Sequence, residues 1–164
     1  MPVEVTTGTL IADLLEAWRI NDCIDSYLID HVPEDAWAAK PPGGKGRSIA
    51  AILAHIHNVR VMWVKAAAKG SPLPDKADAA GRDEVKGALA ESGAAITRIL
   101  ENGLAVGKVS GFAPSAAAFL AYMLAHEAHH RGQVVLLARQ LGHPVPAKAS
   151  YGLWEWNSRG RGAE

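Results

Sequence analysis

Residues 114–144 have the sequence PSAAAFLAYMLAHEAHHRGQVVLLARQLGHP. Proline and serine are favoured at the start of a helix, whereas glycine followed by proline is favoured just beyond its end. Between these signals, apolar side chains recur every three or four residues, as on a helix with one buried face. They are Phe119, Tyr122, Met123, Val134, Leu137 and Leu141. The stretch predicts one long helix at about 115–141.

Two histidines, His126 and His130, occupy the middle of this apolar stripe. Residues four apart on a helix share a face, with Cβ atoms about 5–6 Å apart. Two imidazole nitrogens at that spacing can bind one divalent ion at about 2.0–2.1 Å each. The pair therefore predicts a metal clamp that points into the protein, although a histidine satisfied by an ordinary hydrogen bond is the alternative for each.

Three further segments carry the same period, at about 10–31, 48–69 and 83–101, and Gly/Pro-rich stretches separate them. Ser48 is a favourable N-cap for the helix at about 48–69. Asn102-Gly103 is expected to end the helix at about 83–101. No segment has sustained β alternation, although residues 107–112 leave room for a short strand. The pattern predicts an all-α four-helix bundle, in a helix order that the sequence leaves open.

The composition predicts a single domain over residues 1–164, with 142–164 as a C-terminal tail. Seventeen basic and 17 acidic residues leave no net charge, which argues against nucleic acid as a partner. No apolar run approaches the roughly 18 residues of a membrane span, and no secretory leader is recognisable, so a cytoplasmic protein is expected. The single cysteine, Cys23, is predicted to be a small buried residue.

A third metal ligand is predicted on the second helix. His55 lies on the apolar stripe of that helix, whereas His57 lies about 200° further round and is expected to face elsewhere. Three neutral imidazoles would leave at least one position for water or substrate, as in catalytic zinc sites.

Other polar residues are predicted to support the ligands. His129 is rotated by about 100° from His130, which favours a supporting or interface role. Ligating imidazoles usually donate their second N–H group to an acceptor, and Asp22, Asp25 and Tyr122 are candidates. Arg131 is expected to form a structural salt bridge, with a substrate carboxylate as the alternative.

Residues 126–130 also match the H-E-x-x-H pattern of zinc proteases, in which Glu127 would be the general base. Such an enzyme needs a further ligand and a strand edge that aligns the peptide. Glu155 is the candidate for that ligand, and no convincing strand follows His130. A metal-dependent hydrolase is therefore the third choice of function.

The second-helix stretch SIAAILAHI at 48–56 and the fourth-helix pattern H-x-x-H-H-R-G-Q at 126–133 together resemble the DinB/YfiT-like family. The helix end LGHP at 141–144 and the closing YGLWEW at 151–156 are also similar to that family. In the closing segment, Trp154 and Trp156 are expected to cover the mouth of the bundle. The resemblance implies a four-helix bundle with three metal ligands: His55, His126 and His130.

The resemblance also implies a function. Some relatives are transferases or isomerases that use a low-molecular-weight thiol such as mycothiol, bacillithiol or glutathione, so a small-molecule substrate is expected. The implied cofactor is a divalent metal ion, zinc or nickel, with such a thiol as a further candidate. A metal-binding stress-response module without turnover is the alternative. Pairing into a homodimer is also expected from the resemblance.

Overall fold

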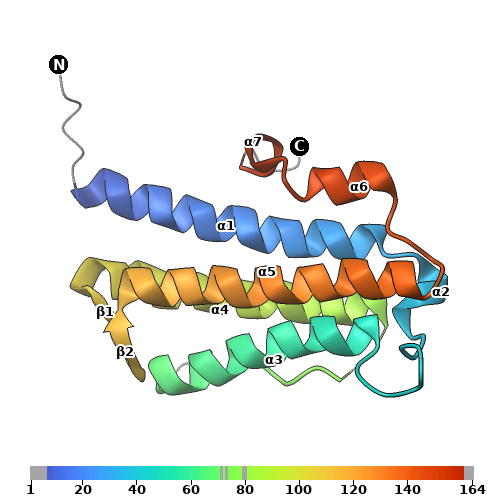
Figure 1. The fold of residues 1–164 in the computed structure, drawn as a ribbon. Helices are drawn as coiled ribbons and strands as arrows, with labels where there is room; N and C mark the ends of the chain where they lie inside the picture. Colours follow the sequence, from blue (N-terminus) through green and yellow to red (C-terminus); the bar gives the residue numbers. More distant parts are fainter. Residues whose placement is uncertain (1–6, 71, 73, 79–80, 161–164) are drawn as a thin grey trace.

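The chain forms an all-α fold, as a computed structural model shows over residues 7–70, 72, 74–78 and 81–160 (Figure 1). The long helices are α1 (Thr7–His31), α3 (Ile49–Ala67), α4 (Arg82–Val106) and α5 (Ala116–Gln140). The short elements are α2 (Glu34–Trp37), β1 (Lys108–Val109), β2 (Phe112–Ser115), α6 (Ala147–Gly152) and α7 (Trp156–Arg159). The predicted fold class is confirmed. The short helices were not predicted, because they are too short to show a 3.6-residue apolar period.

Serine side chains fix the starts of the two helices that carry the histidines. The Ser48 hydroxyl accepts a hydrogen bond of 3.2 Å from the Ala51 amide, and the Ser115 hydroxyl accepts one of 3.2 Å from the Ala118 amide. Each bond satisfies one of the amides that the first helical turn leaves without a partner. Both predicted starts are confirmed to within one residue.

The predicted end of the third long helix is wrong. Helix α4 continues past Asn102-Gly103 to Val106, and Gly107 ends it in a left-handed conformation with φ 80°. Gly103 has a packing role instead, because a Cβ atom built there would lie 2.7 Å from Cγ2 of Val109. The glycine lets strand β1 approach the helix closely.

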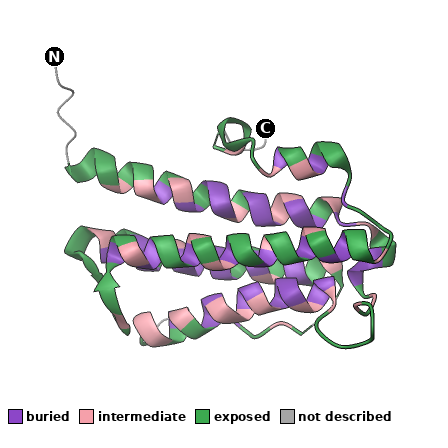
Figure 2. Cartoon of the chain, viewed as in Figure 1, coloured by how far each residue is buried: buried purple, intermediate pink, exposed green. Residues whose placement is uncertain are grey.

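The four long helices form a bundle in which α1 and α3 occupy opposite corners. Each of these two helices packs against both α4 and α5 (Figure 1). Figure 2 shows that the buried positions face the space between the helices, while much of α6 and α7 is exposed. The apolar stripe of α4 is buried and consists of Val85, Leu89, Ile96 and Leu100. The helix order that the sequence left open is thereby settled.

A two-stranded antiparallel hairpin closes one end of the bundle, where only a short strand had been allowed for. Val109 pairs with Phe112, and Gly111 turns the chain with φ 78°. The Phe112 ring packs edge-on against Trp63 of α3, with ring centroids 5.6 Å apart. The hairpin therefore brings an aromatic side chain to the α3–α5 side of the bundle.

Two predictions about burial are wrong. Cys23 is exposed, because the buried face of α1 passes through its neighbours Ile24 and Asp25 instead. Trp154 and Trp156 do not cover the bundle core, since they are 81% and 40% exposed. Among the helices of the described residues, we found none with the length and apolar character needed to cross a membrane.

Candidate metal centre

Three histidine rings meet between α3 and α5. His55 comes from α3, while His126 and His130 lie one turn apart on α5. Ring centroids are 5.6 Å apart for His55 and His126, 4.8 Å for His55 and His130, and 4.5 Å for His126 and His130. One nitrogen of each ring lies within 4.8 Å of the other two. The structure thus brings together the three residues that the sequence predicts as metal ligands.

Gln133 determines which nitrogen of His130 faces the cluster. Its amide oxygen lies 2.8 Å from His130 Nδ1, and its amide nitrogen lies 3.0 Å from Nε2 of His129. Because an amide oxygen only accepts hydrogen bonds, this arrangement places the proton of His130 on Nδ1. The lone pair of His130 Nε2 then points toward His126, whereas His129 contacts both Gln133 and the His130 ring, whose centroid is 5.1 Å from its own.

The donor set fits a divalent metal ion. Nε2 of His126 and Nε2 of His130 are 3.2 Å apart. Two nitrogens bound tetrahedrally at about 2.0–2.1 Å would be about 3.3 Å apart. Nδ1 of His126 is buried and has no hydrogen-bond partner among the described residues. Three imidazoles without a carboxylate in their cluster suit zinc, nickel and similar ions.

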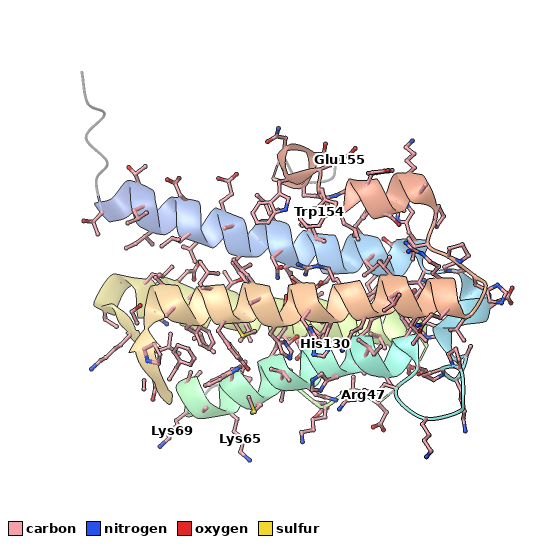
Figure 3. All side chains as sticks on the ribbon, in the orientation of Figure 1. Arg47, Lys65, Lys69, His130, Trp154 and Glu155 are labelled. Carbon is pink, nitrogen blue, oxygen red and sulfur yellow. The ribbon has the colours of Figure 1, made fainter. Side chains whose placement is uncertain are left out.

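Burial favours the neutral form of the three imidazoles, which is the form that binds metal. Burial, with a smaller effect of the neighbouring His130, lowers the pKa of His126 to about 4. Burial also lowers the pKa of His55, and the positive charge of Arg47 adds to the effect. The pKa of His130 is lowered by burial as well, although its hydrogen bond to Gln133 opposes the shift. Figure 3 shows Arg47 near the start of α3.

We expect His126 of the metal-free protein to remain neutral at pH 6. Its pKa of about 4 lies well below the ordinary histidine value of 6.5. Its pKa is lower in the folded than in the unfolded chain, so its contribution to stability is present above about pH 6.5. That contribution is lost as the pH falls toward 4. An NMR titration of the ring proton, assigned with His126→Gln, measures the midpoint. A midpoint near 6.5 would contradict the expectation.

A buried arginine lies at the centre of the bundle beside this cluster. Arg60 of α3 is fully buried, and its Nε and Nη2 donate to the two Glu127 oxygens at 2.7 and 2.9 Å. Nη1 donates to Asp22 at 2.6 Å and to the Leu89 carbonyl at 3.0 Å, and Nη2 also donates to Asp25 at 3.0 Å. These five bonds match the five N–H donors of a guanidinium group.

A second arginine completes the network from α5. Arg131 donates to Asp25 at 2.6 Å and to the Asn21 side-chain oxygen at 2.8 Å, while the Asn21 amide donates to Glu127. The predicted structural salt bridge of Arg131 is confirmed. Asp22 and Asp25, which the sequence offered as partners of the histidines, bind the arginines instead. That prediction is wrong because the carboxylate of Asp22 pairs with Arg60, and that of Asp25 pairs with both arginines.

The network holds three carboxyl groups and two guanidinium groups, so one proton on a carboxyl group makes it neutral. Burial and the adjacent Glu127 raise the pKa of Asp25 to about 8, despite the two arginines. Burial alone would raise the pKa of Glu127, but the charge and hydrogen bonds of Arg60 outweigh burial and lower it. Glu127 is therefore an ionised partner of Arg60. Both of its oxygens are occupied, which argues against its use as a protease base.

His57 was expected to face away from the core, and this is wrong. Its side chain is fully buried, with Nδ1 3.0 Å from the Ser92 hydroxyl and Nε2 2.6 Å from the Asp75 carbonyl. Helix α3 is covered on two sides, by α5 and by α4 with the segment that precedes it. His55 and His57 can therefore both face protein while pointing in different directions.

Aromatic side chains flank the histidine cluster toward the hairpin. The Tyr122 ring stacks on His126 with centroids 6.1 Å apart and an interplanar angle of 22°. Trp63 and Phe112 contact Tyr122 in turn, with centroids 5.7 and 5.8 Å away. Tyr122 thus contacts a predicted ligand by ring stacking, and the cluster gains an apolar flank on one side.

The C-terminal residues lie away from the histidines. Figure 3 shows Trp154 and Glu155 beside α7, whereas His130 faces α3 on the other side of the bundle. Helices α6 and α7 pack on α1, the corner opposite α3. Glu155, the only candidate for an additional protease ligand, is therefore not part of the cluster.

Comparison with known proteins identifies a family for this arrangement. The model of the DinB superfamily matches residues 26–134, which include all three clustered histidines. Searches of curated proteins and of solved structures gave no match.

Proposed function

Since this chain belongs to the DinB superfamily, we propose that it is a metal-dependent enzyme of the thiol-dependent transferase or isomerase kind. A divalent ion, zinc or nickel, would be held by His55, His126 and His130. The observation that carries the proposal is the cluster of three neutral imidazoles, which within the described residues includes no fourth metal-binding side chain. Sites with three protein ligands keep a position for an exchangeable molecule, as catalytic zinc sites do.

Residues around the histidine cluster would favour the binding of a thiolate at the metal ion. A divalent ion bound there would lower the pKa of a thiol or water molecule that coordinates it. Gln133 holds His130 in the tautomer whose Nε2 faces the other two rings. Arg47 supplies positive charge beside His55 and His130, and Tyr122 supplies an apolar wall. A thiolate with its own negative charge suits this environment.

Thiol transfer can be tested directly with metal-loaded, tag-free protein. Mycothiol, bacillithiol and glutathione are each supplied with 1-chloro-2,4-dinitrobenzene and with a panel of further electrophiles. Transfer to the chloroarene forms the aryl thioether and releases chloride and a proton. We expect product with at least one thiol, and we expect its loss after chelation or in His130→Ala. The matched control is His143→Ala, which removes an imidazole from the surface.

Two other results would overturn the proposal in different ways. Tight metal binding with no thiol-dependent product would support a metal-binding module without turnover. Cleavage of peptides or esters that is lost in Glu127→Gln would support a hydrolase. Of these functions, the occupied carboxylate of Glu127 favours the hydrolase least.

Gln133→Ala is expected to weaken metal binding by about 10- to 100-fold, the usual loss when the partner of a ligating histidine is removed. The reason is that Nδ1 of His130 loses its acceptor, so neither the tautomer nor the ring orientation is fixed. Gln133→Glu keeps an acceptor at that position and should retain the affinity. Competition with a chromogenic chelator measures both constants. Equal affinities in wild type and Gln133→Ala would contradict this role.

A further inference from the structure

A second candidate site lies on the side of α5 that faces away from α3. It is a groove of about 530 Å³ between α5 and the C-terminal segment that carries α6 and α7. Pockets of this size are typical of small-molecule sites. The groove shares none of its lining residues with the histidine cluster. An inference about it is therefore independent of the proposed thiol chemistry.

The shape of the groove comes from small residues on one wall and indoles on the other. Ala128 and Gly132 form part of the α5 wall, and a Cβ atom built at Gly132 would meet nothing within 4 Å. Trp154 and Trp156 line the opposite wall, and Leu136, which is 52% exposed, adds to the apolar surface. Together these side chains give the groove a mostly apolar lining.

The charge of the groove favours an anion. Arg131 and Arg139 both line it, and no aspartate or glutamate does. The charge of Arg131 is matched by Asp25. Arg139 is exposed, and among the described residues no ion pair or side-chain hydrogen bond engages it. A guanidinium group that has no partner beside an apolar groove complements a carboxylate, sulfonate or phosphate on an apolar body.

We propose that this groove binds a small organic anion with an aromatic or other apolar body. Trp154 and Trp156 contact the body, and Arg139 binds the acidic group. Indole rings provide large, rigid contact surfaces with little loss of side-chain freedom. The small volume of the groove, and the combination of one cation that lacks a partner among the described residues with apolar walls, favour such a ligand over a charged macromolecule.

The test uses two probes that share an apolar body and differ in charge. 8-Anilinonaphthalene-1-sulfonate is anionic, and N-phenyl-1-naphthylamine is its neutral counterpart. We expect one sulfonate probe to bind per folded chain. Arg139→Gln should weaken that binding about tenfold and leave the neutral probe unchanged, since hydrogen bonds to charged groups contribute about 1.5 kcal/mol or more. Trp154→Ala should weaken both probes. Arg19→Gln, which changes an exposed arginine on α1, is the matched control.

Three results would overturn the proposal. The first is that neither probe binds protein whose near-ultraviolet circular dichroism shows a native fold. The second is that Arg139→Gln leaves the affinity for the sulfonate probe unchanged. The third is sedimentation of the wild type as a dimer and of Trp154→Ala as a monomer, which would identify the groove as an interface between two copies. Metal content of each variant is measured in parallel, so that damage to the histidine cluster is seen separately.

Discussion

Replacing Arg60 with leucine is expected to lower the free energy of unfolding by about 3–5 kcal/mol, the usual loss when one partner of a buried ion pair is removed. Glu127 and Asp25 are almost completely buried and would lose a cation that binds both of them. The Leu89 carbonyl oxygen would also lose one of its donors and keep the Ser92 hydroxyl. Urea denaturation followed by far-ultraviolet circular dichroism measures the loss.

Two further variants show whether the effect comes from burial and geometry. Lys86→Met breaks the exposed ion pair with Asp30 and should cost less than about 1 kcal/mol. Arg60→Lys keeps the charge but has three donors instead of five, so it should lie between wild type and Arg60→Leu. A change below 1 kcal/mol in Arg60→Leu would show that the network does not support the fold.

His126→Ala and His130→Ala are each expected to abolish stoichiometric binding of zinc or nickel. Removing a ligand should cost more than the roughly 10- to 100-fold that removing the partner of a ligand costs. Tag-free protein is dialysed against each metal, and the bound metal is measured by mass spectrometry. Circular dichroism shows whether each variant is folded.

Other histidines of the same chain serve as controls for that experiment. His143→Ala changes an exposed imidazole, and His129→Ala changes one that hydrogen-bonds to Gln133 and contacts the His130 ring. We expect the first to keep full metal content and the second to bind more weakly. Full stoichiometric metal in both His126→Ala and His130→Ala would rule out the proposed centre.

The helices were predictable because their signals are local. Ser48 and Ser115 act on amides three residues away, and the apolar period of α5 repeats along one segment. The same reasoning failed at Gly103, because a glycine that ends a helix and a glycine that admits a neighbouring strand look alike in sequence. Only the position of Val109 distinguishes them.

The histidine cluster was predictable in part for the same reason. The spacing of His126 and His130 is local, and His55 was placed by its stripe on α3 and by family resemblance. The position of His57 was not predictable, because it depends on how closely α4 and the Asp75 segment cover the other side of α3.

The buried charge network could not be derived from local patterns. Arg60 is 67 residues from Glu127 and 35 from Asp25 along the chain. A signal was nevertheless present, since Arg60 interrupts an otherwise apolar stretch and Glu127 falls on the inner side of α5. Charged residues at inward positions of two helices deserve to be considered as partners of each other before they are assigned to the surface.

Adjacent residues of helix α5 face three different surroundings. His126 and His130 face α3, Glu127 and Arg131 enter the charge network, and Ala128 and Gly132 line the outer groove. One inserted or deleted residue before this segment would rotate everything beyond it by about 100°. After an insertion, the histidines would take the place of the charged pair, and the charged pair would face the groove; after a deletion, the charged pair would take the place of the histidines. Changes of chain length in relatives should therefore be confined to the loops, and α5 should vary only by substitution.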